Sequence, residues 1–248
     1  MQENFRQFLD RLRQAGELVD LHQPVDIRHI ATLVDQAKTA LFFHKVIGYD
    51  MPVVSGIIRT KERAMMSMHA ENYREIEDKL QQAITKPIAS KTVKNSSADE
   101  VFLEGDDVDL YKLPIPMSSI YDGGPMITAG IVIARDPEFG LNSGIYRFIV
   151  KEKNLTGIDI VTPNNMRLFA RRALERGEPL PISISIGTHP IEIAGAGYRA
   201  PLGTDEMAIA GGLRGAPVEL AQCRTIDLPC IADAEIVLEA EILPTGWT

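Results

Sequence analysis

Asn142 and Arg147 lie five residues apart and carry side chains that could do chemistry. An asparagine oxygen can ligate a hard cation, and the planar guanidinium fork suits a phosphate or a carboxylate. Residues an odd number apart face opposite sides of a strand, so both side chains reach one ligand only if the chain turns or bulges at Ser143-Gly144. The alternative is a polar hairpin with an exposed arginine, which the spacing alone favours.

The elements that must position these residues are mostly strands. Apolar segments predict strands over 126–134 and 146–150, with a Pro- and Gly-containing turn between them, and a further strand over 155–161. Thr162 and Pro163 predict a helix start, with the helix over 164–176 ended by Gly177. Strict alternation predicts a strand over 180–186, and Thr204 to Glu206 caps a helix reaching Arg214. Two last strands are predicted over 218–224 and 236–243, which gives a curled antiparallel sheet or barrel covered by two helices.

The first hundred residues mix helices and short strands. Helical spacing predicts helices over 3–15, 27–41 and 63–84, the last interrupted near residues 71–72. Short strands are predicted over 18–21, 42–46 and 51–56. The polar segment 86–99 has the composition of a linker or long loop, so we expect domains over 1–100 and 101–248.

Composition excludes several classes of function. The 26 Lys and Arg against 34 Asp and Glu give a net charge of −8, which argues against nucleic acid or an anionic membrane as partner. Cys223 and Cys230 have no second pair, which is not a zinc signature, and we expect free buried thiols. No apolar run approaches the ~20 residues of a membrane span. We therefore expect a cytoplasmic protein.

Several motifs stand out along the chain, namely Leu113-Pro-Ile-Pro116, Asp122-Gly-Gly-x-x-Ile-Thr128, Asn142-Ser-Gly-Ile-Tyr-Arg147, Thr204-Asp-Glu206, Ala210-Gly-Gly-Leu-Arg-Gly215 and Ala234-Glu-Ile-Val-Leu-Glu239. Taken together they resemble the UbiD family of prenylated-flavin-dependent decarboxylases, over essentially the whole chain. The resemblance implies an α+β fold, with an amino-terminal α/β domain at 1–100 and a split β-barrel, similar to flavin reductases, that binds the flavin at 101–248.

The resemblance also implies a set of site residues and cofactors. Asn142, Asn165 and Glu206 would ligate a manganese or magnesium ion that bridges to the phosphate of prenylated FMN. Arg147 would be the catalytic residue beside the flavin ring. The other implied cofactor contacts, which include those to phosphate or a potassium ion, are Ser143, Gly144, Ile145, Tyr146, Asn164, Ala196 and Tyr198.

The implied reaction is the reversible, non-oxidative decarboxylation of an aromatic or α,β-unsaturated carboxylic acid, with the flavin as electron sink. A flavin prenyltransferase would supply the cofactor, and the full-length enzyme would be a homo-oligomer.

Two departures from the family pattern qualify these expectations. Asn165 stands where many members have a histidine ligand. The family's two catalytic carboxylates, in a Glu-Gly-Pro-x-Gly-Glu stretch, and its carboxy-terminal domain would follow residue 248. We therefore expect a fragment, a truncated product or one subunit of a split enzyme. The alternatives are a non-catalytic flavin-binding or assembly module and an inactive fragment that binds nothing.

Overall fold

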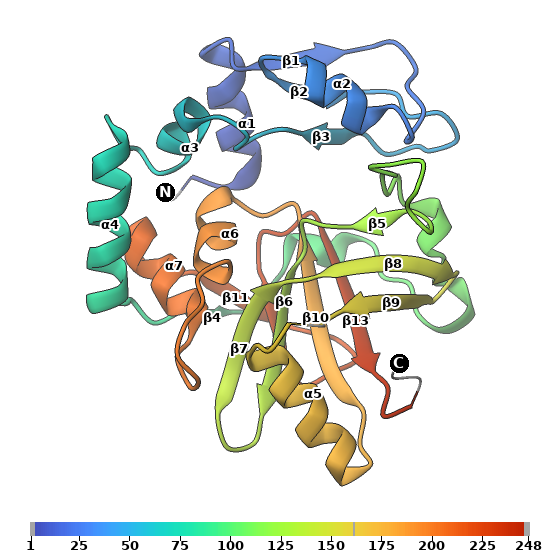
Figure 1. Ribbon diagram of the computed structural model, residues 1–248, viewed down its shortest axis with the longest axis vertical. Coiled ribbons are helices and arrows are strands. Elements are labelled where there is room, and N and C mark those ends of the chain that lie inside the picture. The colour runs from blue at the N-terminus through green and yellow to red at the C-terminus, as the bar shows by residue number, and fades with distance from the viewer. Residues whose placement is uncertain (1–2, 161, 246–248) are drawn as a thin grey trace. The chain divides into compact units, whose positions relative to one another are not determined.

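The structure, a computed structural model, describes residues 3–160 and 162–245 (Figure 1). Its helices are α1 (Phe5–Gln14), α2 (Ile30–Gln36), α3 (Lys61–Ser67), α4 (Tyr73–Thr85), α5 (Asn165–Arg176), α6 (Pro190–Ala196) and α7 (Glu206–Arg214), with short 3-10 turns at Ser97–Glu100, Gly105–Asp107 and Leu110–Lys112. Its strands are β1 (Leu18–Leu21), β2 (Ala40–Phe43), β3 (Val53–Ser55), β4 (Lys91–Val93), β5 (Met126–Ile127), β6 (Ile131–Asp136), β7 (Gly140–Ile145), β8 (Arg147–Glu152), β9 (Leu155–Asp159), β10 (Leu180–Ile186), β11 (Glu219–Gln222), β12 (Pro229–Ile231) and β13 (Ile236–Ile242).

The chain forms two compact units that alternate along the sequence. Unit 1 comprises Met1–Glu71, Leu103–Thr128 and Arg147–Ile158. Unit 2 comprises Asn72–Phe102, Ala129–Tyr146 and Asp159–Thr248. The division into domains at 1–100 and 101–248 stays a prediction.

Unit 1 contains the three-stranded sheet β1-β2-β3 with a helix packed on each face. β2 alternates along its length: Ala40 packs in the cluster of α1, whereas Leu41 and Phe43 pack in the cluster of α2. The fully buried Arg63 of α3 donates hydrogen bonds to the Glu17 carboxylate and to two backbone carbonyls. A second sheet, β5-β8-β9, belongs mostly to the same unit.

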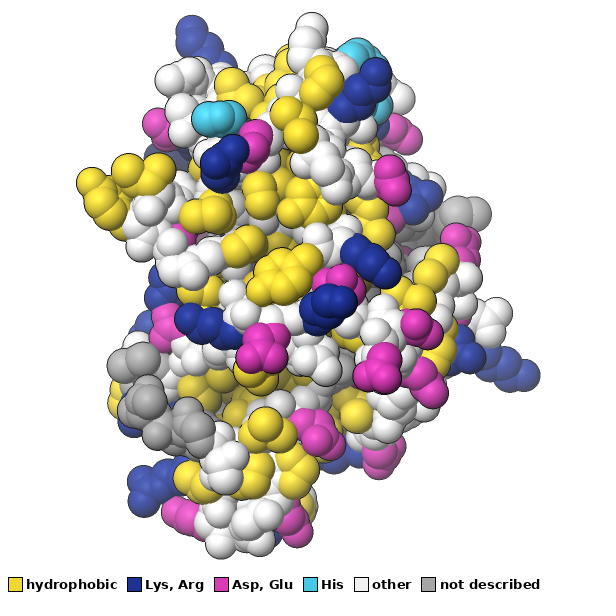
Figure 2. Space-filling view, turned by 90° about the vertical axis from the view of Figure 1, so that its right-hand side faces the viewer, with side chains coloured by type: hydrophobic (Ala, Val, Ile, Leu, Met, Phe, Trp, Pro, Cys, Tyr) yellow, Lys and Arg dark blue, Asp and Glu magenta, His cyan; other side chains and the backbone are white. Residues whose placement is uncertain are grey.

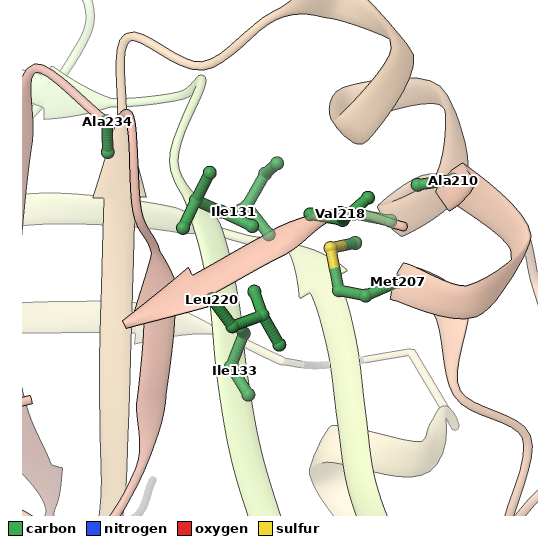
Figure 3. Close-up of a cluster of buried hydrophobic side chains, with 9 residues drawn as sticks. Ile131, Ile133, Met207, Ala210, Val218, Leu220 and Ala234 are labelled. Atoms are coloured by element: carbon green, nitrogen blue, oxygen red, sulfur yellow. The ribbon is translucent and has the colours of Figure 1, made fainter. Parts of the chain in front are cut away.

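Unit 2 is built on the antiparallel sheet β13-β10-β6-β7. Figure 3 shows Ile131 and Ile133 of β6 with Met207 of α7 and Leu220 of β11, within one buried cluster. Their neighbours Val132 and Ala134 are also buried, so β6 is covered on both faces. α5 packs against β6, β7 and β10, and the small sheet β12-β11-β4 completes the unit (Figure 1).

Glycines allow close packing of the helices α4, α6 and α7 in unit 2. A Cβ atom added at Gly195 of α6 would lie 2.6 Å from the Cβ of Ala210 in α7. One added at Gly212 of α7 would lie 2.8 Å from the Cα of Ala83 in α4. The backbones of these helices therefore lie close together. This packing determines the position in space of the first turn of α7.

The predicted mixed α+β class is confirmed, with several local corrections. The cap of α5 is Asn164, not Thr162, because the Asn164 side chain accepts from the Arg167 amide. The predicted strand 126–134 is two strands, and α2 ends before β2, so the predicted helix 27–41 was too long. The described strands form four separate sheets rather than a closed barrel, and the split-barrel detail stays a prediction.

Several elements were missed by the sequence analysis, among them the strand β12, the helix α6 and the strand β4. The last two show why. α6 forms at 190–196, in a segment whose glycines hid the helical pattern, and it begins with Pro190 at its first position. β4 forms inside the predicted linker 86–99, where it pairs in parallel with β11. Both are stabilised by contacts with distant segments, which local sequence does not reveal.

The surface carries mixed charge. On the face shown in Figure 2, acidic and basic side chains are interspersed among apolar ones. Helices in the described part of the chain are all too short or too polar to cross a membrane.

Candidate functional site

β7, an edge strand of its sheet, carries the first predicted site residues. It pairs with β6 in unbroken register, with Asn142 opposite Ala134 and Gly144 opposite Val132. The bulge or turn considered at Ser143-Gly144 is therefore absent. Instead, β7 ends at Ile145, and after Tyr146 the chain leaves unit 2 and begins β8 at Arg147.

The carboxylate of Glu206 caps this strand edge from the first turn of α7. Asp205 is the N-cap of α7, and its side chain accepts from the Met207 amide at 2.9 Å. Glu206 is 2% exposed, and its Oε2 accepts from the Ser143 amide at 2.8 Å. Burial raises the pKa of Glu206 to about 7, although the Ser143 amide opposes the shift. A cation beside this carboxylate would offset its burial.

The Tyr146 side chain folds back over Gly144. A Cβ atom at Gly144 would lie 2.6 Å from Cε2 and 2.7 Å from the hydroxyl oxygen of Tyr146. Burial raises the pKa of Tyr146 to about 12, the neighbouring Asn142 side chain and the Met166 amide oppose the shift, and the Glu206 charge adds to it. This hydroxyl thus lies among groups from β7, α5 and α7.

The first turn of α5 supplies two further predicted residues. Asn164 is the N-cap, and its Oδ1 accepts from the Arg167 amide at 2.8 Å. Asn165 follows as the first helical residue and donates from Nδ2 to the Ala200 carbonyl at 3.3 Å. The helix therefore presents its amino-terminal turn, where anions bind favourably, beside Tyr146.

Two buried donors on β7 have no hydrogen-bond partner. The Nδ2 of Asn142 and the hydroxyl of Ser143 are both unpartnered, and each residue is 3% exposed. Leaving such a group buried and unsatisfied costs about 1–3 kcal/mol. An amide N–H and a hydroxyl can donate to phosphate oxygens, and the Glu206 carboxylate suits a hard cation. These residues fit a metal ion bound together with a phosphate.

The remaining predicted residues lie in two places. Ala196 ends α6 and is buried, and Tyr198 follows it half-buried in unit 2. Ile145 packs partly against the cluster around Ile131. Arg147 is exposed at the start of β8 in unit 1. The roles predicted for all of these residues stay predictions.

The sequence analysis included Tyr146 among the cofactor contacts but predicted nothing about where its side chain lies. A signal was present, because residues two apart share a strand face and Gly144 leaves space for the ring of Tyr146.

The predicted ligand set contains one carboxylate and two amides, and the described residues include no cluster of three His, Cys, Asp or Glu side chains suited to a metal. Cys223 and Cys230 are buried free thiols, as predicted.

Two family models match the chain. Residues 91–247 match the Rift-related domain of 3-octaprenyl-4-hydroxybenzoate carboxy-lyase, UbiD, and residues 9–80 match the amino-terminal domain of the same family.

Solved structures of UbiD-class enzymes are similar to the chain. HmfF from Pelotomaculum thermopropionicum in complex with FMN is 35% identical, with a TM-score of 0.92, over 98% of this chain and 55% of that one. An evolved dimeric form of HmfF with prFMN is 36% identical over 97% of this chain and 57% of that one, with a TM-score of 0.92. Vanillic acid decarboxylase from Sedimentibacter hydroxybenzoicus is 26% identical over 98% of this chain and 56% of that one, with a TM-score of 0.92. The chain thus spans little more than half the length of these relatives.

Proposed function

The chain belongs to the 3-octaprenyl-4-hydroxybenzoate carboxy-lyase (UbiD) family, and from this premise we propose that it is the flavin-binding portion of a prenylated-FMN-dependent decarboxylase. The observation that carries the proposal is the group of buried polar atoms on β7 and α7. Asn142 and Ser143 hold unpartnered donors there, next to the buried Glu206 carboxylate. Similar solved enzymes bind FMN or prFMN.

Each residue has a proposed part in holding the cofactor. Asn142 and Glu206 ligate Mn²⁺ or Mg²⁺ through oxygen, with Asn165 as a third ligand in place of the family's histidine. Ser143 and the first turn of α5 at Asn164 donate to the phosphate. The remaining contacts, which line the flavin or a potassium ion, are Gly144, Ile145, Tyr146, Ala196 and Tyr198.

The proposed reaction releases carbon dioxide from a small aromatic or α,β-unsaturated acid. The bound prenylated flavin would supply the electron sink. Arg147 orients the substrate carboxylate through a bidentate pair, because its guanidinium fork matches the two carboxylate oxygens. A solved relative is named a vanillic acid decarboxylase, which accords with an aromatic acid. A flavin prenyltransferase supplies the cofactor, and the longer enzyme assembles as a homo-oligomer.

The test is to purify the chain from cells that make prenylated FMN, with Mn²⁺ in the buffer. We expect visible flavin absorbance that Glu206→Gln abolishes, because the amide removes the anionic ligand. Glu219→Gln is the matched control, since Glu219 is exposed and pairs with Lys91 at 2.8 Å. Colourless protein from the unsubstituted chain would contradict the proposal.

A second candidate function is a flavin-binding or assembly module without catalysis of its own. It is favoured by the share of the relatives that the chain covers, 55% of HmfF. Carbon dioxide release from aromatic acids separates the two functions. If the chain binds flavin but releases no carbon dioxide, a polypeptide equivalent to the remainder of the relatives is added. Carbon dioxide release after that addition would identify the chain as a partial enzyme. Bound flavin that stays inactive with that addition would favour the module.

A further inference from the structure

The two faces of the sheet β5-β8-β9 differ in exposure. On one face, Phe148 and Val150 of β8 and Ile127 of β5 are buried, between 2% and 5% exposed. Residues along a strand alternate between its faces, so Arg147 and Ile149 of β8 lie on the other one. There Arg147 is exposed and Ile149 is half-buried. This second face, which we call the Arg147 face, is therefore partly open to solvent.

Two apolar side chains adjoin Arg147 on the Arg147 face. Ile149 follows two residues later on β8, so the geometry of a strand places the two Cα atoms about 7 Å apart. Met126 of β5 is the antiparallel partner of Ile149 and is also half-buried. Directly opposed residues of neighbouring strands share a face and lie in contact range. Met126 and Ile149 therefore form one apolar surface beside the position of the guanidinium group.

Glycines border this apolar surface and leave it uncovered. A Cβ atom added at Gly157 of β9 would lie 3.1 Å from Cγ2 of Ile149. One added at Gly123, in the loop before β5, would lie 3.1 Å from Cδ1 of the same side chain. Both positions carry bare backbone next to Ile149, so neither contributes a side chain that covers it. A flat apolar group can consequently lie against Ile149.

We propose that Ile149 is a specificity-determining residue, which together with Met126 receives the hydrocarbon ring of the acid whose carboxylate pairs with Arg147. This inference rests on the proposed function, in which Arg147 orients the substrate. The spacing of about 7 Å between Arg147 and Ile149 suits a single aromatic ring that carries a carboxylate. Removing the ring from water against the two apolar side chains supplies the binding free energy. The site therefore prefers monocyclic to bicyclic aromatic acids.

The experiment measures the binding of benzoate and of 2-naphthoate to the flavin-loaded chain by isothermal titration calorimetry. The unsubstituted chain should bind benzoate more tightly. Ile149→Ala removes contact surface and enlarges the space, so we expect the dissociation constant of benzoate to rise about tenfold and that of 2-naphthoate to change less than about threefold. Ile47→Ala, at an exposed isoleucine of unit 1, is the matched control and should bind both acids as the unsubstituted chain does.

A second variant should change the selectivity in the opposite direction. Gly157→Ala adds a methyl group beside Ile149 and narrows the same space, so 2-naphthoate binding should weaken more than benzoate binding. A general loss of structure would weaken both acids in both variants. Equal effects of Ile149→Ala on the two acids, or binding of neither acid by the flavin-loaded chain, would overturn the inference while leaving flavin binding intact. Absence of flavin from the unsubstituted chain would overturn the proposed function together with this inference.

Discussion

Single buried charges connect the sheet of unit 2 to its helices. Asp136, at the end of β6, is 1% exposed and accepts from the Glu138 amide at 2.9 Å and from the Arg172 guanidinium at 2.9 Å. Burial alone would raise the pKa of Asp136, but these donors outweigh it and hold the pKa below its usual value. Arg172 thus connects α5 to the β6–β7 turn.

Asp136→Asn should lower the free energy of unfolding by about 1–3 kcal/mol near neutral pH. Because the pKa of the folded state is depressed, the charge stabilises the fold above the unfolded pKa of about 4 and the benefit disappears as pH falls through the folded value. Urea unfolding at about pH 7 and pH 3 measures this. Asp227→Asn, which is exposed and paired with Arg135, is the control. If Asp136→Asn lowers the free energy of unfolding by the same amount at both pH values, the stabilisation does not come from the charge of Asp136.

The pKa of Glu192 is shifted in the opposite direction from that of Asp136, so its effect on stability has the opposite dependence on pH. It is 1% exposed in α6, and burial raises its pKa to about 7 although its ion pair with Arg214 opposes the shift. The folded state then holds a proton that the unfolded chain releases near pH ~4.3, so stability falls as pH rises from about 4 to about 7.

Glu192→Gln should therefore reduce the loss of stability between about pH 5 and pH 8, by on the order of 1–3 kcal/mol. Thermal unfolding at the two pH values measures the difference. The exposed Glu175→Gln, whose glutamate pairs with Arg171 at 3.1 Å, should follow the unsubstituted chain. If Glu192→Gln loses as much stability between the two pH values as the unsubstituted chain does, Glu192 does not titrate in this range.

At the scale of elements, small residues determine how closely α7 approaches α4 and α6. Gly212 faces the backbone of Ala83 in α4, and Gly195 of α6 faces Ala210. Because Glu206 is the first residue of α7, this packing also sets the distance from its carboxylate to β7. The glycines therefore contribute to the site without touching a ligand.

Gly212→Ala should destabilise unit 2 by about 1–3 kcal/mol, since the new methyl meets backbone at 2.8 Å and cannot be accommodated by a rotamer change. This cost exceeds the ~1 kcal/mol that alanine gains over glycine in a helix. Urea unfolding midpoints measure it, with Glu77→Ala on the exposed face of α4 as control. An increase in stability would show that α4 and α7 move apart at little cost.

At the scale of the whole molecule, the chain passes repeatedly between two units, and the described contacts of the candidate site lie in unit 2. Binding confined to one unit should protect that unit's amides most. We expect prenylated FMN with Mn²⁺ to slow hydrogen exchange in β7 and at the starts of α5 and α7. The strands β1 to β3 of unit 1 should change little.

Hydrogen exchange followed by mass spectrometry, with and without the cofactor, tests this expectation. Glu206→Gln serves as the control that should lose the protection. Peptides covering β8 report on Arg147 separately, because that residue belongs to unit 1. Protection concentrated in β1 to β3 would place the binding site elsewhere.

Local sequence determined the elements whose boundaries are encoded by neighbouring residues. The ends of α5 and α7 could be predicted because a glycine, which readily adopts the left-handed conformation, follows each helix. In the structure Gly177 and Gly215 both have that conformation, with φ of 72°. Alternation alone located β10. The motif containing Asn142 indicated the family, and the family matches confirmed it.

Only the tertiary structure decided how these elements meet. The hydrogen bond from the Ser143 amide to Glu206 joins residues far apart in sequence, and the Tyr146 ring lies against Gly144. β4 forms because β11 offers it a partner. Propensity and spacing act over a few residues, whereas a site built from β7, α5 and α7 depends on which surfaces are buried together, and packing of the whole unit sets that.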